Sequence, residues 1–537
     1  MTPPEPLLRA RHVSIDYAIP GGHTRAVLDA SVTIYPGQTV AIVGESGSGK
    51  STLASSFLGL LPANATLASG TIEILSRDVT AASEPEWVEL RGQAIGYVPQ
   101  DPTTNLNPAW RVGTQVGEAL RRCRLTRAAR TDRVRELLSA AGLPDPERAR
   151  RSYPHELSGG MAQRALIAQA LACDPPLLIA DEPTSALDAT TAREVLDHLC
   201  ALASSKGTAL LLVTHDLALA CERADHLLVM NKGRICEQGP TRQVISGPVH
   251  PYTRRLLAAL PGGRSRLAAK SKDIAISVVG ASKAFAGARR GESAHVALDG
   301  VDLEVMAGQT CALVGESGSG KTTLARAILG LSPLDAGDIK IFSRSLATAT
   351  KEEAREIRRD IQVVFQNPYA SLDPLYTVSA LIAEPLSILG IGDRRSRRAR
   401  VREMLDAVGL AQSVAGRYPA QLSGGQRQRV AIARALAPSP RIVVLDEATS
   451  ALDVVVQDRI LALLRELQAE WGLTYLMITH DLGLVTANAD TVAVMERGRI
   501  VEWGPVAQVV SSPRQAMTRA LIAATPRLPA SEAGTAG

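Results

Sequence analysis

Short apolar runs alternate with helical patterns along the whole chain. Residues 39–43, 177–180 and 210–213 are continuous apolar runs of strand length, as is typical of strands that are buried on both faces of a parallel sheet. Longer stretches with helical spacing separate these runs, and this alternation predicts an α/β fold.

A more helical segment lies in the middle of each half. Apolar residues recur there at positions i, i+3, i+4 and i+7, which places them on one face of a helix. They are Val134, Leu137, Leu138 and Ala141 in the first half, and Val401, Met404, Leu405 and Val408 in the second. The basic run at residues 394–402 opens the second of these helices; we predict a solvated helix face, with a phosphate or lipid patch as the alternative.

The patterns repeat within the chain. AIVGESGSGKSTL around Lys50 returns as ALVGESGSGKTTL around Lys321, and the LSGG sequence at 157–160 returns at 422–425. We therefore predict two domains, at 1–261 and 274–526. Gly, Lys, Ala and Ser residues predict a flexible linker at 262–273, and a small, polar, aperiodic composition predicts a disordered tail at 527–537.

Composition limits the classes of function. A formal charge of +5 over 537 residues does not favour nucleic-acid binding. The six cysteines form no CxxC pair, which favours a reducing compartment over a disulfide framework or a metal cluster. The N-terminus lacks a signal pattern, and no apolar run approaches the roughly 18 residues that a membrane helix needs, so we expect other subunits to supply any membrane crossing.

Each half contains a glycine-rich loop of the form GxxxxGK[ST] directly after an apolar strand. Glycines let backbone N–H groups converge on phosphates at a helix N-terminus, the lysine reaches the β/γ oxygens, and the hydroxyl of Ser51 or Thr322 ligates Mg²⁺. The alternative is a simple Gly/Ser-rich turn. The predicted ATP-binding residues here are Gly44, Ser46, Gly47, Gly49, Lys50, Ser51 and Thr52, with Gly315, Ser317, Gly318, Gly320, Lys321, Thr322 and Thr323.

Two neighbouring carboxylates follow a buried strand in each half. Asp181 and Asp446 are predicted to hold Mg²⁺ through its water shell. Glu182 and Glu447 are predicted to orient and deprotonate the attacking water. The alternative is that these acids cap the turn after the strand.

A histidine follows a later apolar strand in each half. A polar side chain at the carboxyl edge of the sheet faces the ligand crevice, so we predict that His215 and His480 contact the γ-phosphate. The alternative is a helix-start or hydrogen-bonded core histidine.

The same motifs follow one another in both halves: the phosphate loop, LSGG, the strand-end Asp-Glu, SALD and the strand-end histidine. This order of motifs resembles that of ABC-transporter nucleotide-binding domains. The resemblance implies a P-loop NTPase with two tandem ABC-type domains, each with a RecA-like core, an antiparallel β subdomain and a helical subdomain. It also implies a head-to-tail dimer of the two halves. Ser158, Gly159 and Gly160 then face the ATP at Lys321, while Ser423, Gly424 and Gly425 face the ATP at Lys50.

Further roles come from the same resemblance. Gln100 and Gln366 match the glutamine that links the γ-phosphate and Mg²⁺ to the membrane subunits. Tyr17 and Phe285 match the adenine-stacking aromatic, with ordinary packing as the alternative. Asp188 and Asp453 match a loop that communicates across the dimer, with an aspartate cap as the alternative.

Residues 100–116, 366–386 and 250–257 are similar to segments of the peptide and nickel importer ATPases. This similarity implies a magnesium-dependent ATPase, peripheral to the cytoplasmic face of the membrane, that powers peptide import. Its implied partners are two permease subunits and, through them, an extracytoplasmic solute-binding protein. The alternatives are an importer of glutathione or nickel, an exporter, or a soluble twin-cassette ATPase acting on ribosomes or DNA.

Overall fold

The computed structural model separates into two compact units. One ends at Leu260, and the other runs to Thr525. The predicted linker, apart from Asp273, and the predicted tail lie outside the described residues. The structure describes residues 4–19, 21–123, 125–185, 187–260, 273–286, 294–449 and 452–525.

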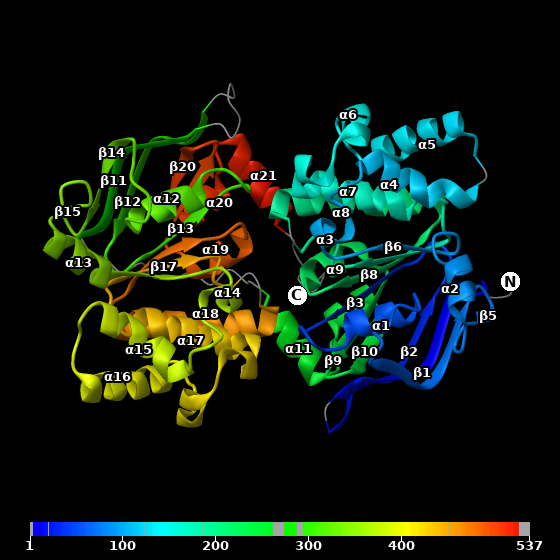
Figure 1. The fold of residues 1–537 in the computed structure, drawn as a ribbon, viewed down its shortest axis with the longest axis horizontal. Coiled ribbons are helices and arrows are strands. Elements are labelled where there is room, and N and C mark those ends of the chain that lie inside the picture. Colours follow the sequence, from blue (N-terminus) through cyan, green and yellow to red (C-terminus); the bar gives the residue numbers. More distant parts are fainter. Residues whose placement is uncertain are drawn as a thin grey trace, which may run out of the picture. The chain divides into compact units, whose positions relative to one another are not determined.

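The first unit contains two sheets (Figure 1). The four-stranded sheet is antiparallel, in the order β2-β1-β4-β5: β1 (Leu8–Ile19), β2 (Gly22–Ile34), β4 (Ala65–Ile74) and β5 (Arg77–Asp78). The six-stranded sheet has the order β10-β9-β3-β8-β7-β6 and is parallel except for β10: β3 (Thr39–Gly44), β6 (Ile95–Val98), β7 (Leu177–Asp181), β8 (Ala209–Thr214), β9 (His226–Asn231) and β10 (Arg234–Pro240).

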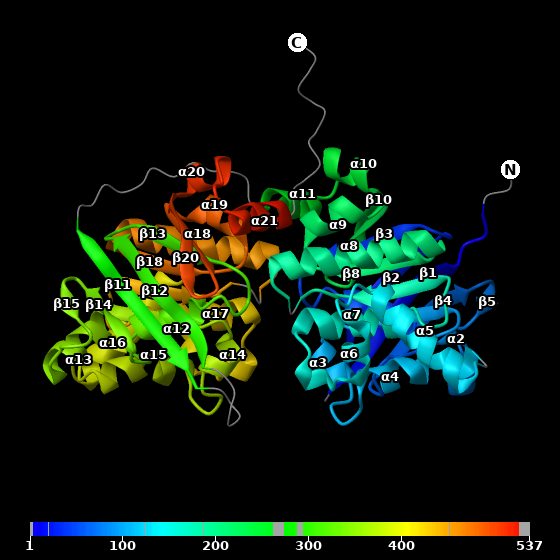
Figure 2. The same cartoon turned by 90° about the horizontal axis from the view of Figure 1, so that it is seen from above.

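The first unit also contains helices, of which α8 contacts β8 (Figure 2). They are α1 (Lys50–Ser56), α2 (Glu84–Leu90), α3 (Pro102–Asn105), α4 (Val112–Ala119), the 3₁₀ turn η1 (Leu120–Cys123), α5 (Arg127–Ala140), α6 (Pro146–Arg151), η2 (Pro154–Glu156), α7 (Gly159–Ala170), α8 (Ala189–Lys206), α9 (Leu217–Arg223), α10 (Thr241–Ser246) and α11 (Pro251–Ala258).

The second unit repeats this topology, with sheets ordered β12-β11-β14-β15 and β16-β17-β18-β13-β19-β20. Its strands are β11 (Ile274–Phe285), β12 (His295–Met306), β13 (Thr310–Val314), β14 (Ala336–Ile341), β15 (Arg344–Ser345), β16 (Ile361–Val364), β17 (Ile442–Asp446), β18 (Thr474–Ile478), β19 (Thr491–Glu496) and β20 (Arg499–Pro505). Its helices are α12 (Lys321–Ile328), α13 (Lys351–Asp360), α14 (Pro368–Ser371), α15 (Val378–Ile388), α16 (Arg394–Ala407), η3 (Gln412–Gly416), η4 (Pro419–Gln421), α17 (Gly424–Leu436), α18 (Val454–Trp471), α19 (Leu482–Asn488), α20 (Val506–Ser511) and α21 (Ala516–Ala524).

The six-stranded sheet is buried on both faces, as its apolar runs predict. Along β8, Leu211 and Val213 pack with the antiparallel sheet and α1, whereas Leu210 and Leu212 pack with α7 and α8. Successive strand residues alternate between the two faces, so an uninterrupted apolar run satisfies both cores. The α/β prediction is confirmed.

The predicted helical subdomain is also confirmed. Residues of α4, α5 and α7 share one apolar cluster that includes Val134, Leu137 and Leu138. In the second unit, Val401, Met404 and Leu405 are buried on α16, where Arg394, Arg395, Arg398 and Arg402 are exposed, as a solvated face requires. No helix in the described ranges is both long and apolar enough to span a membrane.

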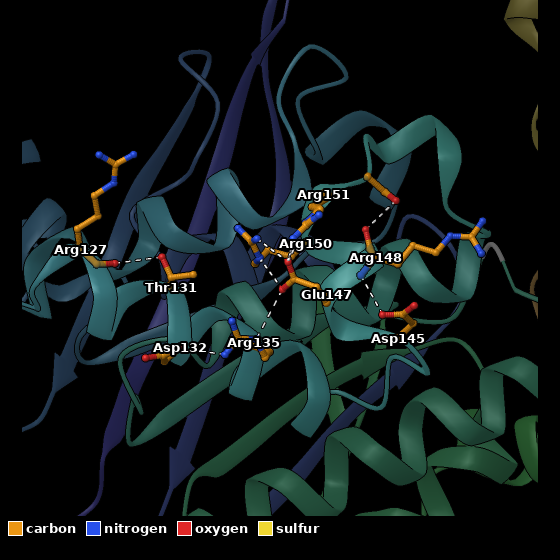
Figure 3. Close-up of polar contacts among 10 residues, drawn as sticks. Arg127, Thr131, Asp132, Arg135, Asp145, Glu147, Arg148, Arg150 and Arg151 are labelled. Atoms are coloured by element: carbon orange, nitrogen blue, oxygen red, sulfur yellow. Dashed lines mark hydrogen bonds and ion pairs between the residues drawn. The ribbon is translucent and has the colours of Figure 1, made fainter.

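Ion pairs hold α5 and α6 together at the surface (Figure 3). Glu147 accepts hydrogen bonds from Arg150 at 2.7 Å and from Arg151 at 2.7 Å, and Arg135 of α5 lies 3.6 Å away. The hydrogen bond from Arg150 is the main reason why the pKa of Glu147 falls to about 2. Glu147 therefore stays ionised and pairs with all three arginines.

Candidate functional site

The phosphate loop of the first unit joins β3 to α1. Gly44 has φ +155°, and a Cβ there would lie 2.1 Å from the carbonyl oxygen of Met230. Gly49 caps α1 with φ +97°, and its Cβ would lie 2.4 Å from the oxygen of Ala26. Both positions therefore require glycine. Because these positions carry no side chain, the backbone N–H groups of the loop stay open to phosphate oxygens. We call this part of the loop the phosphate cradle.

The loop lysines are buried against their own loops. Lys50 is 5% exposed, and its Nζ donates to the carbonyl oxygens of Gly44 and Glu45, both at 2.9 Å. In the second unit, Lys321 makes the same two contacts, at 2.9 Å to Gly315 and 2.7 Å to Glu316. A positive charge is thus fixed at each cradle, which suits a polyphosphate ligand.

Ser51 and Asp181 place two oxygen donors side by side. The Ser51 hydroxyl donates to the Asp181 carboxylate at 3.0 Å. Burial raises the pKa of Asp181, the neighbouring Glu182 raises it further, and Ser51 and Lys50 oppose both effects. A divalent cation would relieve the cost of burying this carboxylate, and Mg²⁺ prefers such oxygen ligands. The pair therefore fits a Mg²⁺ site.

The corresponding pair in the second unit differs. No hydrogen bond joins Thr322 to Asp446 within the described ranges. Burial and Glu447 raise the pKa of Asp446, whereas the charges of Arg326 and Lys321 lower it. Ser55 stands where the second unit has Arg326, so the two carboxylates meet different electrostatic surroundings.

Glu182 lies at the centre of a three-residue contact. It accepts a hydrogen bond from Gln100 Nε2 at 3.0 Å, and His215 Nδ1 lies 3.3 Å from the same oxygen. Burial opposes ionisation of Glu182, but the hydrogen bond and charge of His215, with the charge of Lys50, outweigh it and lower the pKa. The hydrogen bond to Glu182 in turn raises the pKa of His215.

The second unit has the same arrangement. Gln366 donates to Glu447 at 2.6 Å, and His480 Nδ1 lies 3.3 Å from its other oxygen. The hydrogen bond from His480 lowers the pKa of Glu447 against the effect of burial. Glu182 and Glu447 both have φ +45°, a strained conformation for a glutamate. The structure thus brings the predicted glutamine, glutamate and histidine together in each unit.

Two further loop residues were missed by sequence reasoning. The hydroxyls of Ser48 and Ser319 are buried in the two phosphate loops and have no hydrogen-bond partner in the structure. A Cβ at Gly44 would lie 3.0 Å from the Ser48 hydroxyl, so this serine packs beneath the loop. Both are variable positions of GxxxxGK[ST], so the motif alone gave no signal for them.

The predicted adenine aromatics lie in unlike surroundings. Tyr17 is half-buried on β1, and its hydroxyl lies 3.3 Å from the hydroxyl of Thr52 in α1. Phe285 ends β11, is 47% exposed and has Lys283 Nζ 5.9 Å from its ring centroid. Tyr17 therefore lies beside the loop helix, whereas Phe285 is exposed and has the Lys283 ammonium over its ring.

The LSGG sequences begin helices. Ser158 caps α7 by accepting from the N–H of Met161 at 3.3 Å, and Ser423 caps α17 in the same way. Gly160 packs so closely on α8 that a Cβ would lie 2.4 Å from Thr191 Cγ2. The remaining predicted residues, Gly159, Gly424 and Gly425, occupy the first turns of these two helices.

Asp188 and Asp453 act as helix caps in the structure. Asp188 accepts from the N–H of Thr191 at 3.1 Å, and Asp453 accepts from the N–H of Val456 at 3.0 Å. The alternative of an aspartate cap is thus observed for both residues.

A C-terminal helix of the first unit reaches the phosphate loop. The hydroxyl of Tyr252, on α11, accepts a hydrogen bond from the backbone N–H of Glu45 at 3.0 Å. Tyr252 is only 1% exposed, and His250 caps the same helix. Residues 250–253 therefore support the phosphate loop through the hydroxyl of Tyr252.

Comparison with known proteins identifies matching families. A model described as ABC transporter matches residues 27–185 and 298–450. A second, described as the C-terminal region of oligopeptide/dipeptide transporters, matches residues 236–289, which include α11.

Individual relatives match along most of their length. The peptidoglycan transport ATP-binding protein YejF of Agrobacterium fabrum is 44% identical, over 97% of this chain and 96% of its own. The oligopeptide transport ATP-binding protein OppD of Mycobacterium tuberculosis is 38% identical, over 97% and 98%. The glutathione import ATP-binding protein GsiA of Escherichia coli is 38% identical, over 93% and 86%.

Proposed function

This chain belongs to the ABC transporter ATP-binding proteins, and from that premise we propose that it is the ATP-hydrolysing subunit that powers import of peptides across the cytoplasmic membrane. The match to the oligopeptide/dipeptide transporter C-terminal region carries the choice of peptides. That region includes α11, which contacts the phosphate loop through Tyr252 and Glu45.

Each unit carries a phosphate loop, ligands for Mg²⁺ and a general base for water. The loop amides and Lys50 or Lys321 bind the phosphates of ATP. Ser51, Asp181 and Gln100 would hold Mg²⁺ in the first unit, and Thr322, Asp446 and Gln366 would hold it in the second. A Mg²⁺ ion held there would supply positive charge against the phosphate oxygens.

The glutamates act as general bases in this proposal. The lowered pKa of Glu182 and of Glu447 keeps each ionised at neutral pH and able to accept a proton from water. His215 and His480 hold these carboxylates in place and can turn toward the γ-phosphate, while Gln100 and Gln366 donate hydrogen bonds to the same carboxylates.

The two halves pair head to tail in this proposal. Ser158, Gly159 and Gly160 complete the site of Lys321, and Ser423, Gly424 and Gly425 complete the site of Lys50. Helix N-termini support this role, since α7 and α17 begin at these residues and their first N–H groups favour anions.

Permease subunits dock on the segments that follow Gln100 and Gln366. A polar cavity of about 430 Å³, lined by Arg111, Gly113, Thr114, Arg150 and Arg151, lies at the first of these segments and suits an acidic side chain of a permease loop. Trp110 and Leu375 are 47% and 80% exposed in the two segments, as expected of surfaces that a partner covers. The chain is then peripheral to the cytoplasmic face, and a solute-binding protein meets the permeases on the other side.

Purification of the chain from its own membranes tests this function. We expect two multi-helix subunits to co-purify and, after reconstitution in liposomes, di- and oligopeptides to stimulate ATP hydrolysis. Chain carrying Glu182→Gln and Glu447→Gln should keep the partners and lose the stimulation. Stimulation by glutathione or nickel in place of peptides would overturn the assigned solute, and purification without membrane subunits would overturn the transport role.

A further inference from the structure

Two cysteines that are far apart in the sequence meet in the helical subdomain of the first unit. The Sγ atoms of Cys123 and Cys173 lie 2.7 Å apart, and 50 residues separate them along the chain. Cys123 ends η1, and Cys173 follows α7; both are free thiols and half-buried. No other two cysteine sulfurs make contact within the described ranges.

The contact is close to bonding distance. A disulfide has an S–S length of about 2.05 Å, so only a small movement separates these sulfurs from a bond. The Cys173 thiol also donates to the carbonyl oxygen of Ala119 at 3.3 Å, so its sulfur has a second contact in the same subdomain.

We propose that Cys123 and Cys173 form a reversible modification site, oxidised to a disulfide by exchange with a low-molecular-weight disulfide such as glutathione disulfide. In the first step the Cys123 thiolate attacks glutathione disulfide, forms a mixed disulfide and releases one glutathione thiolate. In the second step the Cys173 sulfur attacks Cys123 Sγ, gives up its proton to solvent and releases the second glutathione thiolate. Two protein thiols are oxidised, and one glutathione disulfide is reduced to two glutathione molecules.

The order of the steps follows from burial. Burial and the contact with Cys123 raise the pKa of Cys173 to about 12, so this thiol is a poor first nucleophile at neutral pH. Once Cys123 carries glutathione, Cys173 lies beside the bond to be broken, and this proximity offsets its low nucleophilicity.

The modification would mark only one half of the protein. Cys311, on β13, is the one cysteine of the second unit, and Pro438 follows α17 at the place of Cys173. In the first unit, η1 continues α4, which lies next to the segment proposed to dock a permease, and α7 begins with LSGG. A disulfide would therefore fix the end of one helix to the end of the other. The proposal does not depend on which solute is transported.

Mass spectrometry of the full chain after equilibration with glutathione and glutathione disulfide, followed by alkylation of free thiols, tests this directly. We expect a peptide pair joined through Cys123 and Cys173, which dithiothreitol separates. Recovery of both cysteines as alkylated thiols under oxidising conditions, or of both carrying glutathione without a link, would overturn the proposal.

Serine variants provide a second, independent readout. Cys173→Ser should retain glutathione on Cys123, because the resolving sulfur is gone, whereas Cys123→Ser should leave Cys173 mostly unmodified. Cys236→Ser is the matched control and should keep the link. Equal glutathione labelling of Cys123 and Cys173 in the two single variants would contradict the assigned order of attack.

Discussion

The backbone N–H of Glu45 donates to the hydroxyl of Tyr252 at 3.0 Å, which ties the phosphate loop to a helix 207 residues further along the chain. Met517 takes the place of Tyr252 in the second unit and is also buried, but it offers only a thioether. The two phosphate loops therefore rest on different supports.

Tyr252→Phe removes that hydrogen-bond acceptor and keeps the ring. We expect the free energy of unfolding to fall by about 1 kcal/mol, the usual net worth of such a bond. ATP affinity of the first site should also fall, because the loop loses a fixed point. Urea unfolding and nucleotide titration measure the two effects.

Met517→Leu is the control for this change, since it alters a buried side chain of similar volume at the matching place. Tyr252→Met gives the first unit the support of the second. If Tyr252→Phe left both stability and nucleotide affinity unchanged, the bond would have no role in holding the loop.

Glu182→Gln with Glu447→Gln should remove hydrolysis and spare binding. A glutamine keeps the contacts to Gln100 and Gln366 but cannot accept a proton from water. A positioned general base contributes about 10²- to 10⁴-fold, so the rate should fall by at least about 100-fold. Phosphate release and nucleotide binding are measured together, with Glu156→Gln as an exposed control. Retention of near-normal turnover in the double variant would rule out these glutamates as bases.

The histidine–glutamate pairs should make stability depend on pH. The pKa of Glu182 is lowered from 4.5, so its contribution is present above about pH 4.5 and is lost as pH falls through the lowered value. The pKa of His215 is raised from 6.5, so its contribution is present below about pH 6.5 and is lost as pH rises through the raised value. Both groups are therefore charged, and the ion pair contributes fully to stability, between about pH 4.5 and 6.5.

His215→Gln with His480→Gln should accordingly destabilise the chain most between about pH 4.5 and 6.5. The difference from wild type should shrink toward pH 9. Urea midpoints at pH 5.5 and 9 give the comparison, and His295→Gln, at an exposed position on β12, serves as control. An equal loss of stability at both pH values would mean that the pairs are not ionic.

Two glycines of α4 should respond oppositely to the same substitution. A Cβ at Gly113 would lie 2.3 Å from Arg150 Cγ and 2.7 Å from its carbonyl oxygen, so Gly113→Ala should cost about 1–3 kcal/mol through overpacking. A Cβ at Gly117 would meet only Val134 Cγ2 at 3.6 Å and Arg130 Cδ at 3.8 Å. Gly117→Ala should therefore be tolerated and gain up to about 1 kcal/mol of helix propensity. The free energy of unfolding is the deciding measurement, and a loss at Gly117 as large as at Gly113 would show that α4 and α5 are packed differently.

Much of the fold follows from patterns between near neighbours. Residues 210–213 predict a doubly buried strand, and β8 includes them, because a continuous apolar run of that length satisfies both faces of a parallel sheet. The approach of Glu182 and His215 was also foreseeable, because both follow apolar runs and the carboxyl ends of parallel strands meet at one edge. Gln100 was expected there only from the resemblance to ABC-transporter domains.

Contacts between distant segments could not be predicted in this way. Nothing near Cys123 in the sequence indicates Cys173, since only the packing of α4 and α7 brings the ends of these helices together. The same holds for Arg326. It lies about one turn after Thr322 on α12, and its charge lowers the pKa of Asp446. Equal motifs in the two halves therefore concealed unequal surroundings.

Glu182 and Glu447 both have φ +45°. The proposed catalysis requires a glutamate at these positions, whereas this backbone conformation makes a glutamate there unfavourable for folding. A glutamate in that conformation costs about 1–3 kcal/mol, whereas glycine adopts it freely and asparagine at little cost. Directed evolution for heat resistance alone would thus enrich glycine or asparagine at these two positions. The selected variants would be more stable proteins that bind ATP but no longer hydrolyse it.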